Sequence, residues 1–169
     1  MRSSVVTSLI VGGALMFGAT AWAQQPAPAT PPPAQYGTPG VNLEEAKKAV
    51  EAAEAEAKKN GWFLAIAVVT NGGYLVHFSR MDQTQIASIQ IAQHKAKAAA
   101  TFRRPTKAFQ DGLTANPPNL VLLTLDGVIA SEGGIPLMRG GKIIGAIGCS
   151  GATSAQDGQA CKAGADTIK

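Results

Sequence analysis

The residues best suited to hold a negatively charged ligand lie near the end of a predicted long helix. Lys95 lies within that helix, and Arg103 and Arg104 follow its last residues. Arginine can grip a carboxylate through two parallel N–H bonds, and lysine can add a point charge. Pro105 disfavours a helical Arg104, so the chain bends there. Cations at a helix C-terminus also complement the helix dipole without any ligand, so both interpretations stay open.

Two histidines could act as metal or haem iron ligands, because imidazole is a common axial donor. His94 lies on a polar helix face with Gln90 and Lys97, which equally fits a solvated surface or a subunit interface. His77 lies in a predicted strand on the same face as Leu75, where a structural role is the alternative. With two histidines and two cysteines, the chain has too few plausible ligands for a four-ligand zinc site.

Three carboxylates fall in predicted loops or helix caps, at Asp82, Glu132 and Asp157. A turn or a cap explains each of them, and no paired spacing marks a general acid/base dyad. The alternative is an enzyme, a small-molecule lyase or isomerase, that acts through Asp82, Lys95 and Glu132.

An apolar hairpin that runs into a helix start, over residues 132–157, is the most informative stretch of the chain. Residues 135–138 and 142–148 are β-prone runs, and the short glycine-containing connector between them predicts a hairpin. A turn that contains Ser150 then leads into a helix. Backbone N–H groups at a helix N-terminus can face a ligand, so this turn is a candidate wall of a binding site.

Cys149 ends the second strand of this hairpin, and Cys161 lies near the second turn of the following helix. If that helix packs back on the sheet, the two Cα atoms could come within the separation of about 4.4–6.8 Å that a disulfide needs. Two separate buried thiols are the alternative. A reactive cysteine is disfavoured, since there is no C-x-x-C motif.

The N-terminal residues predict export. Residues 1–23 combine Arg2, an apolar run and an Ala21-Trp22-Ala23 cleavage site, which predicts a signal peptide cleaved after Ala23. The protein would then be periplasmic or secreted, without stable membrane insertion. Residues 24–40, rich in proline and alanine, predict a disordered linker before a single domain over residues 41–169.

Composition fits a globular domain and excludes one class of partner. The chain is 46% hydrophobic and 15% charged, with a formal net charge of +4. This charge permits attraction to anionic small molecules, but the sequence has no basic stripe, and export makes nucleic acid an unsuitable partner.

Hydrophobic periodicity and caps predict an α+β domain, an antiparallel β-sheet with helices packed on it. Asn42 with Glu45 predicts the first helix through a capping box. Residues 120–125 and 128–130 are ambiguous between strand and buried connector. The elements are predicted as helices over residues 43–59, 84–101, 106–112 and 154–167, and as strands over residues 62–70, 74–79, 135–138 and 142–148.

Seven short blocks of the chain follow one another in the order and spacing of a known family. The blocks are Leu43-Glu44-Glu45-Ala46, Asn71-Gly72-Gly73, Arg80-Met81-Asp82, Ile91-Ala92-Gln93-His94-Lys95-Ala96, Phe102-Arg103-Arg104-Pro105-Thr106, Gly133-Gly134-Ile135-Pro136 and Ile144-Gly145-Ala146-Ile147-Gly148. In these blocks the chain resembles the GlcG/HbpS-like family, also known as the haem-degrading or DUF336 domain, which includes the C-terminal domain of PduO. The resemblance implies a profilin-like arrangement, a tendency to form homo-oligomers, and haem as a ligand.

The leading hypothesis is an exported protein that binds haem or a similar anionic planar ligand between the second long helix and residues 132–151. His94 or Met81 would be the iron donor, with His77 a further candidate. Haem degradation, or a role as an oligomeric sensory or accessory subunit, are the alternatives. The predicted ligand-binding residues are Lys95, Phe102, Arg103, Arg104, Met81, Asp82, Glu132, Gly133, Gly134 and Ser150.

Overall fold

The computed structural model describes residues 34–169, so the predicted signal peptide and most of the predicted linker lie outside the described residues. Two pairs of consecutive strands are separated by helices, which is the order expected of an α+β domain. In chain order they are α1 (Leu43–Lys59), β1 (Ala65–Val69), β2 (Leu75–Arg80), α2 (Ala87–Thr101), α3 (Lys107–Thr114), the 3₁₀ helix η1 (Leu120–Thr124), β3 (Gly134–Arg139), β4 (Lys142–Ser150) and α4 (Ser154–Ala165).

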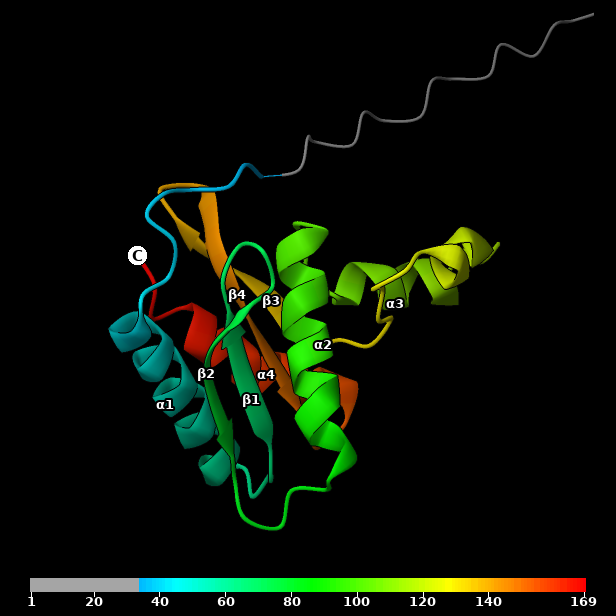
Figure 1. Ribbon diagram of the computed structural model, residues 1–169. Coiled ribbons are helices and arrows are strands. Elements are labelled where there is room, and N and C mark those ends of the chain that lie inside the picture. Colours follow the sequence, from blue (N-terminus) through cyan, green and yellow to red (C-terminus); the bar gives the residue numbers. More distant parts are fainter. Residues whose placement is uncertain (1–33) are drawn as a thin grey trace, which may run out of the picture. The chain divides into compact units, whose positions relative to one another are not determined.

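The strands form one four-stranded sheet in the order β2-β1-β4-β3, and each neighbouring pair is antiparallel (Figure 1). The long hairpin β3–β4 is the one that the apolar runs predict. β1 lies in the centre, where its five residues are all buried. The prediction of an antiparallel α+β domain is therefore confirmed.

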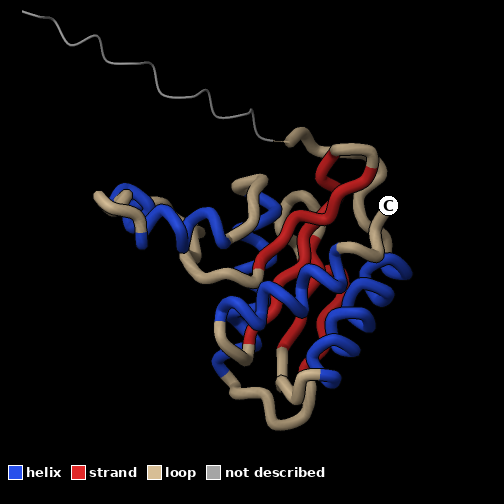
Figure 2. Tube along the Cα trace, turned by 180° about the vertical axis from the view of Figure 1, so that it is seen from behind, coloured by secondary structure: helices blue, strands red, loops and turns tan. Residues whose placement is uncertain are grey.

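Helices cover both faces of the sheet (Figures 1 and 2). Ile66 and Val68 of β1 pack with α1 and α4 on one face, whereas Ala65, Ala67 and Val69 pack with α2 on the other. This division follows from the alternation of side chains along a strand. The central strands must therefore be apolar at every position, because neither of their faces meets water.

Helix α2 crosses the sheet very closely, and glycine makes this possible. A Cβ atom on Gly148 of β4 would lie 2.1 Å from the carbonyl oxygen of Ala92, and one on Gly134 of β3 would lie 2.3 Å from that of Lys95. These two glycines are cross-strand partners. The buried face of α2 is mostly alanine, so the helix backbone rests almost directly on the glycine pair.

Local signals account for the start of α1. Asn42 accepts a hydrogen bond from the backbone N–H of Glu45, and the Glu45 carboxylate accepts one from the backbone N–H of Asn42. This is the predicted capping box. Arg139 at the end of β3 forms an ion pair with Glu45, which ties the helix start to the sheet edge.

Residues 120–125 differ from the sequence-based expectation. They begin with the 3₁₀ helix η1 and are largely exposed, with Leu120 61% and Leu123 69% exposed. The expected strand or buried connector was wrong, because local apolarity does not specify what will cover a segment. Helix α3 and η1 extend to one side of the three layers (Figures 1 and 2), and we call residues 107–125 the arm.

Residues 35–37, at the end of the predicted linker, lie beside β4. The backbone N–H of Gly37 donates to the carbonyl of Ile143, and the N–H of Ile143 donates to that of Gln35. Tyr36 also donates from its hydroxyl to the carbonyl of Ala100. These contacts join the approach to α1 with the sheet and the end of α2.

Candidate functional site

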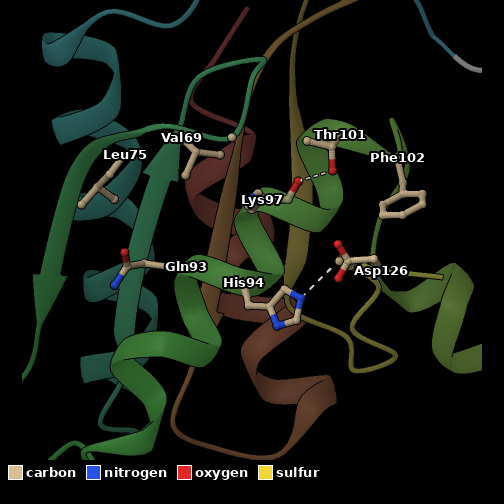
Figure 3. Close-up of a pocket in the computed structure, with 10 residues that line it drawn as sticks. Val69, Leu75, Gln93, His94, Lys97, Thr101, Phe102 and Asp126 are labelled. Atoms are coloured by element: carbon tan, nitrogen blue, oxygen red, sulfur yellow. Dashed lines mark hydrogen bonds between the residues drawn. The ribbon is translucent and has the colours of Figure 1, made fainter. Parts of the chain in front are cut away.

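The His94 hollow is a concavity of about 490 Å³ on the α2 side of the sheet (Figure 3). Helix α2 forms one wall, the β1–β2 hairpin forms a second, and the loop before β3 forms a third. Its lining residues are Val69, Gly73, Leu75, Gln93, His94, Lys97, Thr101, Phe102, Asp126 and Gly127. Ligand pockets in proteins typically measure about 300–1,000 Å³, so this hollow can hold a small molecule.

His94 is held at the edge of this hollow by the loop before β3. Its Nε2 lies 3.3 Å from the carbonyl oxygen of Gly127 (Figure 3). In the tautomer that donates this hydrogen bond, Nδ1 keeps its lone pair. A histidine whose other ring N–H is bound to a carbonyl is the usual arrangement for a metal ligand.

Apolar and charged side chains line the rest of the His94 hollow. Val69 is buried, Leu75 is exposed, and Phe102 packs edge to face on Phe109 with ring centroids 5.4 Å apart. Lys97 is an exposed residue one helical turn beyond His94, and it supplies a positive charge. The hollow thus combines an imidazole, an apolar wall and a cation.

A second concavity, the Glu132 hollow, also measures about 490 Å³. It lies at the β3 edge of the sheet, between β3, the end of α4 and the segment before α3. Three of the predicted ligand-binding residues, Glu132, Gly133 and Gly134, line it together with Pro105, Lys107, Ile135, Pro136, Met138, Lys162, Ala165, Asp166 and Ile168.

A buried ion pair lies behind this second hollow. The Nζ atom of Lys95 is 2.8 Å from Oδ2 of Asp157 and donates to the carbonyl of Glu132 at 2.7 Å. Lys95 is 1% exposed and Asp157 is 2% exposed. Burial raises the pKa of the Asp157 carboxyl, and the ammonium of Lys95 opposes that shift. Lys95 was predicted to meet a ligand, but its charge is committed to Asp157.

The two arginines point to aromatic rings rather than into either hollow. The guanidinium carbon of Arg103 lies 5.7 Å from the centroid of Tyr36, and that of Arg104 lies 5.8 Å from the centroid of Phe109. Arg103 has a φ of 55°, a left-handed conformation that turns the chain after α2. The guanidinium groups thus stabilise this turn through cation–π contacts.

The other predicted site residues are dispersed. Met81 and Asp82 line a separate hollow after β2, whereas Glu132 precedes β3 at the opposite edge of the sheet. Ser150 is buried under α2, 3.3 Å from Ser88 Oγ, and cannot wall a cleft. His77 is half-buried in β2. A catalytic group of Asp82, Lys95 and Glu132 therefore does not assemble.

The expected cleft between α2 and residues 132–151 does not extend to Gly148 and Ser150, because both lie directly beneath α2. Of the ten residues that line the His94 hollow, the sequence predicted His94 and Phe102 as site residues and missed the other eight, among them Leu75, Lys97 and Asp126. A signal existed for Lys97, which shares the polar face of the helix with His94. The loop residues carried no signal, since only folding brings them to α2.

Cys149 and Cys161 are joined by a disulfide with a Cα–Cα distance of 5.7 Å, and both residues are fully buried.

Within residues 34–169, no group of three or more His, Cys, Asp or Glu side chains could hold a metal ion. In the same part of the chain, no helix is long and apolar enough to cross a membrane.

Comparison with known proteins relates the chain to a family. The model of the family described as haem degrading protein HbpS-like matches residues 41–166. GlcG of Escherichia coli K12 is 41% identical over 101 residues, which are 60% of this chain and 74% of GlcG.

Solved structures show the same fold. A double mutant of HbpS from Streptomyces reticuli is 30% identical with a TM-score of 0.70, over 84% of this chain and 99% of that chain. A complex of PduOC with heme has 22% identity and a TM-score of 0.69, over 77% of this chain and 96% of the other.

Proposed function

This chain belongs to the HbpS-like family, and we propose that it binds haem or a similar planar, anionic molecule in the His94 hollow. The observation that carries the proposal is the presence of an imidazole, an apolar wall and a cation in one concavity of about 490 Å³. A related fold, PduOC, has been solved as a complex with heme.

The donor set of the hollow fits an iron porphyrin. His94 offers Nδ1 while Gly127 accepts the N–H of Nε2, so the ring is oriented before a ligand arrives. Leu75 and Phe102 offer apolar contact to the ring system. Lys97 would pair with one carboxylate of the ligand, and Asp126 limits how much negative charge the hollow accepts.

Replacement of His94 tests this assignment. In the full-length protein, His94→Ala should weaken hemin binding by about 10-fold or more, because an axial donor is removed. It should also shift the Soret band of the complex. Lys97→Ala should weaken binding by about 2- to 5-fold, as expected for one exposed ion pair. Hemin titration followed by absorbance measures both effects.

His77→Ala is the matched control, since it removes the other histidine, which lies in β2 outside the hollow. This variant should keep the affinity and the Soret band of the unaltered protein. An unchanged titration for His94→Ala, or an equal loss for His77→Ala, would contradict the assignment.

We also propose that the protein is exported. The signal-peptide pattern of residues 1–23 and a disulfide between its cysteines both suit an oxidising compartment. The mature protein isolated from the cell envelope of its host should begin at Gln24. Intact-mass measurement checks this, and a species that retains residues 1–23 in the cytoplasm would argue against export.

The arm supports a second element of the proposal, self-association. Leu120, Val121 and Leu123 are each more than half exposed on η1, and an exposed apolar patch is typical of a protein contact. Leu123→Glu should therefore shift the protein to a smaller species in light scattering. Thr124→Glu places the same charge beside the patch as a control. If light scattering shows that the unaltered protein is already a monomer, self-association is refuted.

A further inference from the structure

We propose that the Glu132 hollow is a second binding site, which takes a small organic cation with an ammonium group on an apolar body. This site is separate from the His94 hollow, and the proposal does not depend on haem binding. It rests on three features of the lining: one carboxylate without a partner, two lysines already paired, and an apolar floor.

Glu132 carries the open charge of this hollow. Its backbone is fully used, because its N–H donates to Oε1 of Gln110 at 2.9 Å and its carbonyl accepts from Lys95. Its half-buried carboxylate has no ion pair or hydrogen bond within residues 34–169. A Cβ on Gly158 would lie 2.5 Å from Oε1 of Glu132, so the carboxylate rests against α4. A ligand N–H group can supply the donor that it lacks.

The lysines at the rim are poorly placed to attract an anion. Nζ of Lys107 lies 2.6 Å from Oδ1 of Asp111, and Nζ of Lys162 lies 2.7 Å from Oδ2 of Asp166. Asp111 raises the pKa of Lys107, and the charge of Glu132 adds to that effect, so Lys107 keeps its charge beside Asp111. An incoming carboxylate would compete with an aspartate at each lysine, whereas an ammonium would meet an unpaired Glu132.

The floor of the hollow suits an apolar body rather than an added strand. Ile135 and Ile168 are half-buried and pack on the main core, and Met138 continues this surface. β3 is an edge strand, but Pro136 has no N–H to offer to a further strand. The N–H of Gly134 already donates to the hydroxyl of Thr106, and the carbonyl of Gly134 already accepts from the backbone N–H of Thr106. The free edge is thus blocked, and a compact small molecule is the better fit.

Three probes with the same six-carbon chain test the site: n-hexylamine, 1-hexanol and n-hexanoate. Titration calorimetry on the full-length protein near pH 7, without hemin, measures their affinities. Hexylammonium should bind about 10-fold more tightly than hexanoate, with the alcohol between them. Glu132→Gln should bring all three probes to similar affinity, because it removes the charge and keeps the shape of the side chain.

Asp82→Asn is the matched control, since it removes an exposed carboxylate that lines a different hollow. It should keep the preference for the ammonium. Met138→Trp should weaken all three probes by filling the hollow. Hexanoate binding as tight as hexylammonium, a preserved preference in Glu132→Gln, or no saturable binding of the amine would each overturn the proposal. The His94→Ala result on hemin would stand in every one of these cases.

Discussion

Asp157→Asn should lower the free energy of unfolding by about 3–5 kcal/mol, the usual cost of breaking a buried ion pair from one side. The substitution keeps the shape of the side chain, so the loss would come from charge rather than from a cavity. It leaves the Lys95 ammonium buried without a counter-ion, and it weakens the acceptor of the Ala152 N–H. Urea unfolding followed by circular dichroism measures the change.

Asp166→Asn is the control for this effect. Asp166 pairs with Lys162 at 2.7 Å, but their side chains are 62% and 68% exposed. Water screens such a pair, so the variant should lose no more than about 1 kcal/mol. Equal losses for the two variants would show that burial of the Lys95–Asp157 pair does not matter.

A double-mutant cycle separates the pair from its surroundings. Lys95→Met alone leaves Asp157 buried without its counter-ion, and Lys95→Met with Asp157→Asn leaves no buried charge. The double variant should therefore be clearly more stable than the sum of the two single losses predicts. Strict additivity would mean that Lys95 and Asp157 are not coupled.

Cys149→Ala with Cys161→Ala should lower the free energy of unfolding by about 3 kcal/mol, because the disulfide closes a short loop and restricts the unfolded chain. The two cysteines are 12 residues apart in sequence and join β4 to α4. For a domain of this size the loss corresponds to a fall in Tm of roughly 10 °C. Thermal unfolding under oxidising conditions measures it.

Reductant provides the complementary test of the disulfide. Both sulfurs belong to fully buried residues, so dithiothreitol should leave the native protein oxidised until urea opens the structure. In urea with dithiothreitol, the unaltered protein should then match the double alanine variant in stability. Rapid alkylation of both cysteines in native protein without reductant would contradict the bond.

Local sequence determined the framework of this protein. The capping box at Asn42 and Glu45 begins α1, and the glycine connector between two apolar runs forms the β3–β4 hairpin. Both features depend on residues a few positions apart, so the spacing of those residues in the sequence is enough to predict them. The same is true of α4, because its N-cap Thr153 forms a capping box with Gln156 three residues later.

The tertiary structure alone decided which of the chemically suitable residues are available to a ligand. Lys95 and Asp157 are 62 positions apart, and only the packing of α2 and α4 against the sheet removes both from solvent. The same packing buries Ser150, and it places His94 and Glu132 in the linings of two different hollows. Periodicity reports that a helix has a polar and an apolar face. It does not report what lies opposite each side chain, because that depends on contacts between segments far apart in the chain.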